Sequence, residues 1–479
     1  MSTVHTDAKR RIAVIGGGLA GLTAALRLID LARQTGRPID VTVFEAADRL
    51  GGAIETTRIR GYLVERGADS FLTKPPIVKL CERLGLSNDL LPTDPQFRGA
   101  LVLRKGRPVR VPEGFGLMAP AKLWPIVKTP VLSTGGKLRL LAERFVPKRT
   151  VQGDESLGAF VRRRLGDEVF ERLVQPLVAG IYTADPEKLS LAATLPRFLE
   201  MERTHGSLIR AMRRSPQDAN DEASGARYGL FAGLRDGMEQ LFAALRREVQ
   251  TGATIRLGSR VGALRRERGE WRIEMDVDGP QSLGFDAVIL ALPAYASADL
   301  LSRTAGGLVS LLRLIPYASS AVVVTGHRRK DVSHPLDAFG LVIPAIEKRD
   351  ALAVSFASRK FPHRAPKDRV LLRTFVGGAT RPEMLARSDD ELVAIVRKEL
   401  GALLGVSGLP DLTLVTRYED AMPQYHVGHL DLIAEIEAAA NRQPALELTG
   451  SAYRGVGIPD VVADAERAAT RIFEAATIE

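Results

Sequence analysis

The chain has 479 residues and a formal net charge of +10, with 67 Lys and Arg against 57 Asp and Glu. Hydrophobic residues make up 45% and charged residues 26%, which is ordinary for globular proteins and excludes a disordered or fibrous chain. This length predicts two or three domains. The single cysteine, Cys81, excludes an internal disulfide framework and a thiolate metal cluster. No uncharged apolar run of about 20 residues is present, so no membrane-spanning helix is predicted.

A short apolar strand and a glycine turn begin the chain. Arg11–Ile15 is β-branched and apolar, which is typical of a buried parallel strand. Gly16, Gly18 and Gly21 follow in the spacing G-x-G-x-x-G. The first glycine permits a tight turn, the second allows a pyrophosphate to approach the backbone, and the third allows close packing of helix on strand.

A helix is predicted over residues 19–33, directly after the glycine turn. Its first residues, Leu19 and Ala20, carry amides that point at the phosphates of a bound dinucleotide. A second strand ends at Glu45, 24 residues after Gly21, where a carboxylate can accept both hydroxyls of a ribose. Strand, turn, helix and acid in this register predict a dinucleotide site in a Rossmann-like α/β domain.

Arg49, Gly51 and Gly52 follow the second strand in the spacing R-x-G-G. This element resembles the corresponding loop of two-dinucleotide-domain flavoproteins. Its glycines allow a close turn beside the pyrophosphate, and Arg49 can offset the negative charge. A plain surface loop is the alternative interpretation.

The middle of the chain changes in composition. Residues 112–215 are rich in Pro, Leu and basic residues and predict helices, whereas residues 214–227 resemble a linker loop. From about residue 225 onward helices and strands mix. Strands are predicted at 253–257, 271–275, 287–292, 320–324, 352–356, 370–375 and 446–448.

The C-terminal end presents a second glycine turn in front of a helix. Gly450 leads to Val456, Gly457 and Ile458, and Pro459 suits the first position of a helix. Such a helix start presents amides and a positive dipole end, which stabilise negative charge on the ring edge of a reduced flavin. An ordinary helix cap is the alternative. Together the two chain ends predict one FAD, held by its diphosphate at one end and by its ring edge at the other.

At this point the motifs resemble the oxygen-dependent coproporphyrinogen III and protoporphyrinogen IX oxidases of haem synthesis, FAD enzymes of the monoamine-oxidase-like superfamily. The most specific stretches are 61–71, 163–168, 180–191 and 453–460. The resemblance implies a two-dinucleotide-binding FAD domain, a substrate domain with a mixed sheet, and a helical domain. We expect the FAD domain at 1–80, 225–297 and 440–479, the substrate domain at 81–111 and 298–439, and the helical domain at 112–224.

The resemblance implies a six-electron oxidation of a porphyrinogen to a porphyrin, with FAD as hydride acceptor and O2 reduced to H2O2. Coproporphyrinogen III is the expected substrate, because a basic protein suits its four propionates and the C-terminal motif resembles the bacterial coproporphyrinogen branch. Protoporphyrinogen IX is the alternative. An amine oxidase or carotenoid desaturase is a more distant alternative. The C-terminal turn has a single aromatic residue, Tyr453, which argues against an amine oxidase. A non-catalytic binding protein of the same fold is a further alternative. The intact glycines and Glu45 argue against it, because they indicate that the cofactor site is retained.

The resemblance also suggests residues that contact the substrate. Phe375 and Val342 match apolar positions that sandwich the tetrapyrrole, with ordinary core strands as the alternative, and Gly180 lies in a matching motif. Asp69 is the candidate catalytic residue, because it matches a position near the flavin. It can orient the substrate there, and capping of its own loop is the alternative. Three further residues match cofactor positions: Gly67, Ala68 and Val261.

Glu55 departs from the family pattern, since some relatives carry a basic residue there that meets a substrate carboxylate. Because Glu55 would repel a propionate, we expect anchoring by Arg58, Arg60 or the helical region.

His426 and His429 lie three residues apart without further ligands nearby, so no metal site is predicted and both are expected in a loop or at the surface. The runs Arg162–Arg164 and Arg265–Arg266 are expected to be solvated faces, because no nucleic-acid-binding motif accompanies them.

Residues 115–147 combine apolar side chains such as Trp124 with basic ones such as Lys128. This pattern favours contact with an anionic membrane surface, and a cover over a substrate channel is the alternative. The other partners expected are the porphyrinogen, O2 and neighbouring enzymes of haem synthesis. A single cysteine suits the cytoplasm, with the inner face of the cell membrane as a second location.

Overall fold

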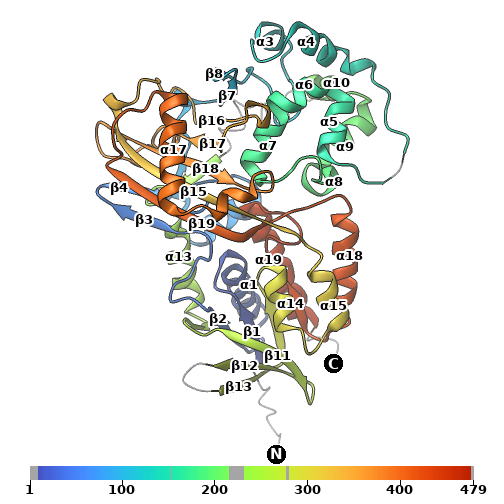
Figure 1. Ribbon diagram of the computed structural model, residues 1–479. Helices are drawn as coiled ribbons and strands as arrows, with labels where there is room; N and C mark the ends of the chain where they lie inside the picture. The colour runs from blue at the N-terminus through green and yellow to red at the C-terminus, as the bar shows by residue number, and fades with distance from the viewer. Residues whose placement is uncertain (1–8, 152, 215–230, 277–279, 476–479) are drawn as a thin grey trace, which may run out of the picture.

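The computed structural model describes residues 9–151, 153–214, 231–276 and 280–475. Figure 1 shows a lower layer of strands and helices that carries a large sheet at the upper left and a group of helices at the upper right. Beyond residue 214, the predicted linker over 214–227 lies outside the described residues. No described helix is both long enough and apolar enough to cross a bilayer.

A parallel sheet of five strands forms the centre of the lower layer (Figure 1). Ile12 and Val14 face one covering layer, whereas Ala13 and Ile15 face the other, because successive side chains of a strand alternate. Burial on both faces explains why the strands are almost wholly apolar. In spatial order the strands are β10 (Ala253–Arg256), β2 (Ile39–Phe44), β1 (Arg10–Ile15), β14 (Ala287–Leu290) and β20 (Leu446–Leu448).

Helices from both ends of the chain cover one face of this sheet. The predicted first helix extends to Thr35 as α1 (Leu19–Thr35) and packs against the last helix, α19 (Ile458–Glu474). This layer is completed by α13 (Glu239–Val249) and α2 (Pro75–Arg83). The other face carries β11 (Val261–Glu267), β12 (Glu270–Asp276), β13 (Pro280–Phe285), α14 (Ala294–Leu300), α15 (Gly306–Leu312) and α18 (His429–Ala440). The predicted α/β class with a Rossmann-like layer is confirmed.

A second sheet of seven strands lies above this layer (Figure 1). Its core on one side is closed by α17 (Asp389–Leu404). Residues 101–110 add a hairpin to strands from the second half of the chain. In spatial order the strands are β19 (Leu412–Pro423), β15 (Tyr317–Arg328), β18 (Arg369–Gly377), β17 (Ala351–Ser355), β16 (Gly340–Val342), β7 (Leu101–Arg104) and β8 (Arg107–Arg110).

Two further small sheets are formed by short strands. One pairs β3 (Thr56–Ile59) with β4 (Tyr62–Glu65). The other has the order β5 (Phe71–Leu72), β9 (Phe231–Leu234) and β6 (Leu90–Pro92).

The helical group has its own apolar core. Its helices are α3 (Trp124–Lys128), α4 (Thr134–Leu141), α5 (Leu157–Leu165), α6 (Asp167–Val169), α7 (Gln175–Tyr182), α8 (Leu191–Thr194), α9 (Pro196–His205) and α10 (Leu208–Arg214). The expectation that Arg162–Arg164 is a solvated face is wrong for Arg164, whose side chain is 0% exposed and pairs with Glu143 and Glu202. A buried cation must be paired, and these carboxylates from other elements supply its partners.

Candidate functional site

The first glycine turn contains two glycines that the fold itself requires. Gly16 has φ +113°, and a Cβ there would come within 2.4 Å of the carbonyl oxygen of Ala291. A Cβ on Gly21 would lie 1.8 Å from the carbonyl oxygen of Gly16. Gly18 differs, because its φ is −79° and no heavy atom of the described chain lies within 4 Å of a Cβ there. The open space before Gly18 therefore fits a ligand that approaches the backbone.

Glu45 lies beside this turn at the end of β2. Its carboxylate accepts hydrogen bonds from the N–H of Gly17 at 2.6 Å and from the N–H of Ala47 at 2.8 Å. The N–H of Ser259 donates to the Glu45 carbonyl at 2.8 Å, which brings the chain just before Val261 to the same edge. The carboxyl edge of the sheet thus gathers the turn, the acid and the Val261 segment.

The loop after β2 folds back onto the first turn. Gly51 and Gly52 have φ of +111° and +58°, and the N–H of Gly51 donates to the carbonyl of Gly17 at 3.0 Å. The Arg49 guanidinium donates to the Gly52 carbonyl at 2.7 Å and pairs with Glu55 at 3.2 Å. These contacts of Arg49 stabilise the loop, and its positive charge can also stabilise a phosphate.

Gly67 and Ala68 lie where a second loop meets the first. A Cβ on Gly67 would come within 2.2 Å of the carbonyl oxygen of Ala53, so the two loops touch through bare backbone. Arg373 of β18 donates to the Gly67 carbonyl and connects this contact to the upper sheet.

The C-terminal turn follows β20 and lies close to the first turn. Gly450 has φ +131°, and its N–H donates to Asp464 at 3.1 Å. A Cβ on Gly450 would lie 4.0 Å from the carbonyl oxygen of Leu292. Gly16 packs against the carbonyl of Ala291, the residue just before Leu292. Both turns therefore flank the same stretch after β14.

Tyr425 and His429 support this turn, and sequence reasoning missed this role. The Tyr425 hydroxyl accepts the N–H of Gly455 at 2.8 Å and donates to the carbonyl of Ser451 at 2.6 Å. Its ring stacks on His429 at 3.9 Å between centroids. His429 is 3% exposed, so its expected surface position is wrong. Burial lowers the pKa of His429, despite a hydrogen bond with the Tyr453 carbonyl.

A cavity of about 650 Å³ opens in front of the C-terminal turn. Val456, Gly457 and Ile458 line it at the start of α19. Lys74 crosses from the loop after β5 and pairs with Asp460 at 3.0 Å. The predicted cofactor residues of the last helix thus face open space.

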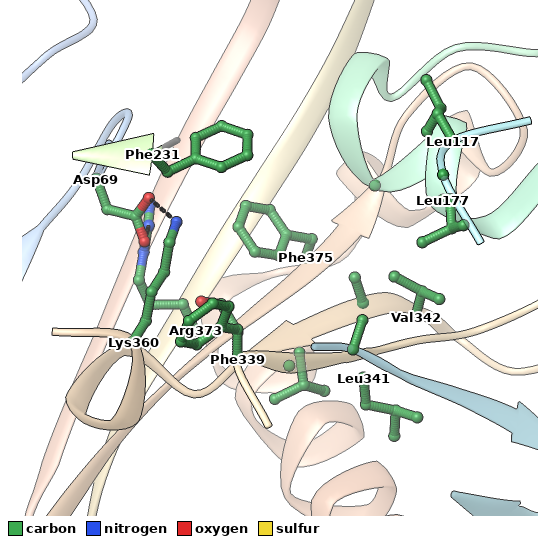
Figure 2. A pocket seen from close by; sticks show the side chains of 17 residues that line it. Asp69, Leu117, Leu177, Phe231, Phe339, Leu341, Val342, Lys360, Arg373 and Phe375 are labelled. Carbon is green, nitrogen blue, oxygen red and sulfur yellow. Dashed lines mark hydrogen bonds and ion pairs between the residues drawn. The ribbon is translucent and has the colours of Figure 1, made fainter. Parts of the chain in front are cut away.

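A neighbouring cavity of about 250 Å³ brings together the four predicted substrate-site residues. Asp69, Gly180, Val342 and Phe375 all line it, although they come from a loop, α7, β16 and β18. Figure 2 shows an ionic cluster at one end of this cavity, apolar side chains at the other and Phe375 between them. Phe231 lines both cavities, so they adjoin.

The ionic cluster consists of Asp69, Lys360 and Arg373. Asp69 pairs with the Lys360 ammonium at 2.8 Å and with the Arg373 guanidinium at 3.0 Å. Burial raises the pKa of Asp69, but the two cations outweigh burial and hold it well below its usual range. Sequence reasoning missed both cations. Arg373 lies two positions before Phe375 on β18, whereas Lys360 carries no local signal.

The expected anchors Arg58 and Arg60 lie elsewhere. Arg58 pairs with Asp236 at 3.2 Å, and Arg60 donates to the carbonyl of Asp411 at 2.6 Å. Neither is among the described residues that line the two cavities, so that expectation is wrong for these two arginines, whereas Arg197 of the helical region does line the larger cavity. Glu55 is bound by arginines and does not face the smaller cavity either.

The fold and the two glycine turns define a dinucleotide-binding flavoprotein with an adjoining apolar cavity. The family model for flavin containing amine oxidoreductases matches residues 19–473. The chain therefore belongs to this family and is an oxidoreductase with FAD as its cofactor, as the sequence predicts. The open approach to Gly18 fits this cofactor.

Relatives resemble the chain over nearly its full length. A coproporphyrinogen III oxidase of Bacillus subtilis (strain 168) is 35% identical over 95% of this chain and 96% of the relative. A chloroplastic protoporphyrinogen oxidase of Nicotiana tabacum is 30% identical over 96% and 84%. A crystal structure from Exiguobacterium sp. 255-15, described as a candidate protoporphyrinogen oxidase, has a TM-score of 0.85 at 30% identity and covers 97% of this chain and 99% of its own. The predicted resemblance to porphyrinogen oxidases is confirmed.

Proposed function

We propose that this protein oxidises coproporphyrinogen III to coproporphyrin III, with O2 as the final electron acceptor. The observation that carries this proposal is the cavity in which Asp69, Gly180, Val342 and Phe375 converge beside the C-terminal turn. The similarity to a coproporphyrinogen III oxidase supports the choice of substrate. Bound FAD supplies hydride acceptance and transfer of electrons to O2, so the protein mainly has to position the substrate and exclude water.

The residues of the smaller cavity have distinct parts in this proposal. Phe375 and Val342 offer apolar surface to the tetrapyrrole. Gly180 adds no side chain to the wall that faces Val342, and a Cβ there would lie in van der Waals contact with Val342, 3.7 Å from its methyl group. Asp69, held ionised by its two cations, can accept a pyrrole N–H and cannot supply a proton near neutral pH.

The proposed cofactor contacts follow the two turns. Gly16, Gly18 and Gly21 with the first amides of α1, at Leu19 and Ala20, take the diphosphate. Glu45 takes a ribose. The remaining proposed contacts are Arg49, Gly51, Gly52, Gly67, Ala68, Val261, Gly450, Val456, Gly457 and Ile458.

Protoporphyrinogen IX is the second candidate substrate, because a relative with 30% identity is a protoporphyrinogen oxidase. The test mixes the purified enzyme with each porphyrinogen without oxygen and follows bleaching of the flavin. Air is then admitted and porphyrin fluorescence is measured. We expect faster bleaching by coproporphyrinogen III. Bleaching by a primary amine and by neither porphyrinogen would overturn the proposal.

We further propose a location in the cytoplasm, near other enzymes of haem synthesis, with contact to an anionic membrane surface. Leu117, Ile126 and Val131 of the segment 115–147 are buried core residues, unlike the expectation of an exposed apolar face. Trp124 and Phe145 are exposed, however, and basic residues lie over their rings. Sedimentation with anionic vesicles should weaken when both aromatic residues become serine, and unchanged sedimentation would refute the contact.

A further inference from the structure

We propose that Lys360, which shares the Asp69 carboxylate with Arg373, forms a subsite for a substrate carboxylate and selects a tetracarboxylate porphyrinogen over a dicarboxylate one. This inference rests on the proposed function and names the anchor that Glu55, Arg58 and Arg60 do not provide.

The first argument is the charge balance of the cluster. Lys360 and Arg373 carry two positive charges, whereas Asp69 carries one negative charge. The adjacent buried pair of Glu65 and Arg364, 3.8 Å apart, is neutral in sum and does not alter this excess. One positive charge is therefore unmatched at the cavity wall, where solvent screens it weakly. An incoming carboxylate would balance it.

The second argument concerns hydrogen-bond donors. The Lys360 ammonium donates to Asp69 at 2.8 Å and to Ser70 at 2.7 Å. Within the described chain these bonds use two of its three N–H groups. The ammonium also lies 5.7 Å and 5.4 Å from the ring centroids of Phe231 and Phe361, and the third N–H has no oxygen acceptor in the described chain, so it can meet a ligand. The Arg373 guanidinium is engaged by Asp69 and the Gly67 carbonyl and is 4% exposed, so Lys360 is the cation that reaches the substrate.

The third argument is the surroundings of the cluster. The rest of the cavity wall is mainly apolar, with Leu117, Leu177 and Val342 at the opposite end (Figure 2). Both substrates carry propionates along one edge of the macrocycle. Coproporphyrinogen III has two more on the opposite edge, where protoporphyrinogen IX has vinyl groups. The proposal places this second edge at Lys360, where the cation would pair with an additional propionate and would be left unpaired by a vinyl group.

The test compares Lys360→Met with the wild-type holoenzyme. Asp69 keeps Arg373 as its partner in this variant, so the buried charges remain balanced and the protein should fold with its flavin. We expect the KM for coproporphyrinogen III to rise about 10-fold or more, the effect of one charge-assisted hydrogen bond. The KM for protoporphyrinogen IX and both kcat values should change less than about twofold.

Matched variants make the test specific. Lys398→Met removes the same charge from an exposed site on α17 and should change neither KM. Lys360→Arg should restore most of the selectivity. Asp69→Asn leaves two unmatched cations and should tighten binding of the product coproporphyrin III, in the opposite direction to Lys360→Met.

Equal losses with both porphyrinogens, or no change in either KM, would overturn the subsite. If the wild-type enzyme oxidises neither porphyrinogen, the proposed function fails separately. The subsite is then judged by direct binding of coproporphyrin III, measured by fluorescence quenching. The subsite predicts weaker binding to Lys360→Met than to Lys398→Met, and equal binding would reject it.

Discussion

Gly18→Val separates ligand binding from folding more cleanly than any other change in the first glycine turn. The backbone at Gly18 has φ −79° and ψ −171°, which an L residue adopts without strain, and the space before a Cβ is open. Loss of glycine at a helix N-cap should cost about 1 kcal/mol of stability at most. The added methyl groups, however, occupy the approach of the diphosphate. If one or two charge-assisted hydrogen bonds are lost, the affinity for FAD should fall roughly 100-fold.

The assay is equilibrium titration of the flavin-free protein with FAD, together with thermal unfolding of that same form. Gly307→Val is the matched control, since Gly307 also faces open space but lies on α15. Gly21→Ala should behave in the opposite way and destabilise the fold, because its Cβ would overlap the carbonyl of Gly16. Wild-type affinity for FAD in Gly18→Val would refute the reasoning, as would unfolding of the flavin-free variant.

Three other outcomes are expected. Glu143→Gln removes one of the two carboxylates that pair with the buried Arg164 and leaves Glu202, so it should lower the free energy of unfolding by about 1.5–3 kcal/mol in urea denaturation; a loss below about 1 kcal/mol would contradict this. The lowered pKa of His429 means that the unfolded chain binds more protons below about pH 6.5, so stability should fall toward pH 5. His429→Asn should flatten that fall, and an unchanged fall would contradict the assignment to His429. Phe375→Ala should raise the KM for the porphyrinogen without changing flavin content, and an unchanged KM would reject its contact with substrate.

Local patterns were sufficient to predict the first strand, glycine turn and helix of the lower layer. Gly16, Gly18 and Gly21 act within one turn. The alternation of side chains between the two faces of β1 follows from consecutive residues. The end of β18 was less predictable. The segment 370–375 has an apolar core that indicates a strand, but the pairing that extends it to Gly377 comes from β15 and β17.

The ionic parts of the molecule could not be predicted from local sequence, because their partners lie far apart along the chain. Asp69 meets Lys360 and Arg373 only after three elements have packed together. Arg164 belongs to a run of basic residues that predicts a solvent-exposed surface, but its side chain is buried and pairs with Glu143. Charge runs alone do not show whether a carboxylate from another element will cover them.

The central claim is that one FAD is held at both chain ends, by its diphosphate at the first glycine turn and by its ring at the start of α19. Equilibrium binding of FAD and of ADP to the flavin-free protein tests it most directly, since ADP lacks the ring. Gly457→Ala, whose Cβ would lie 2.9 Å from a carboxylate oxygen of Asp460, should weaken FAD and leave ADP unchanged. Gly18→Val should weaken both ligands. Equal losses of FAD and ADP in Gly457→Ala, or unchanged binding of both, would contradict the account.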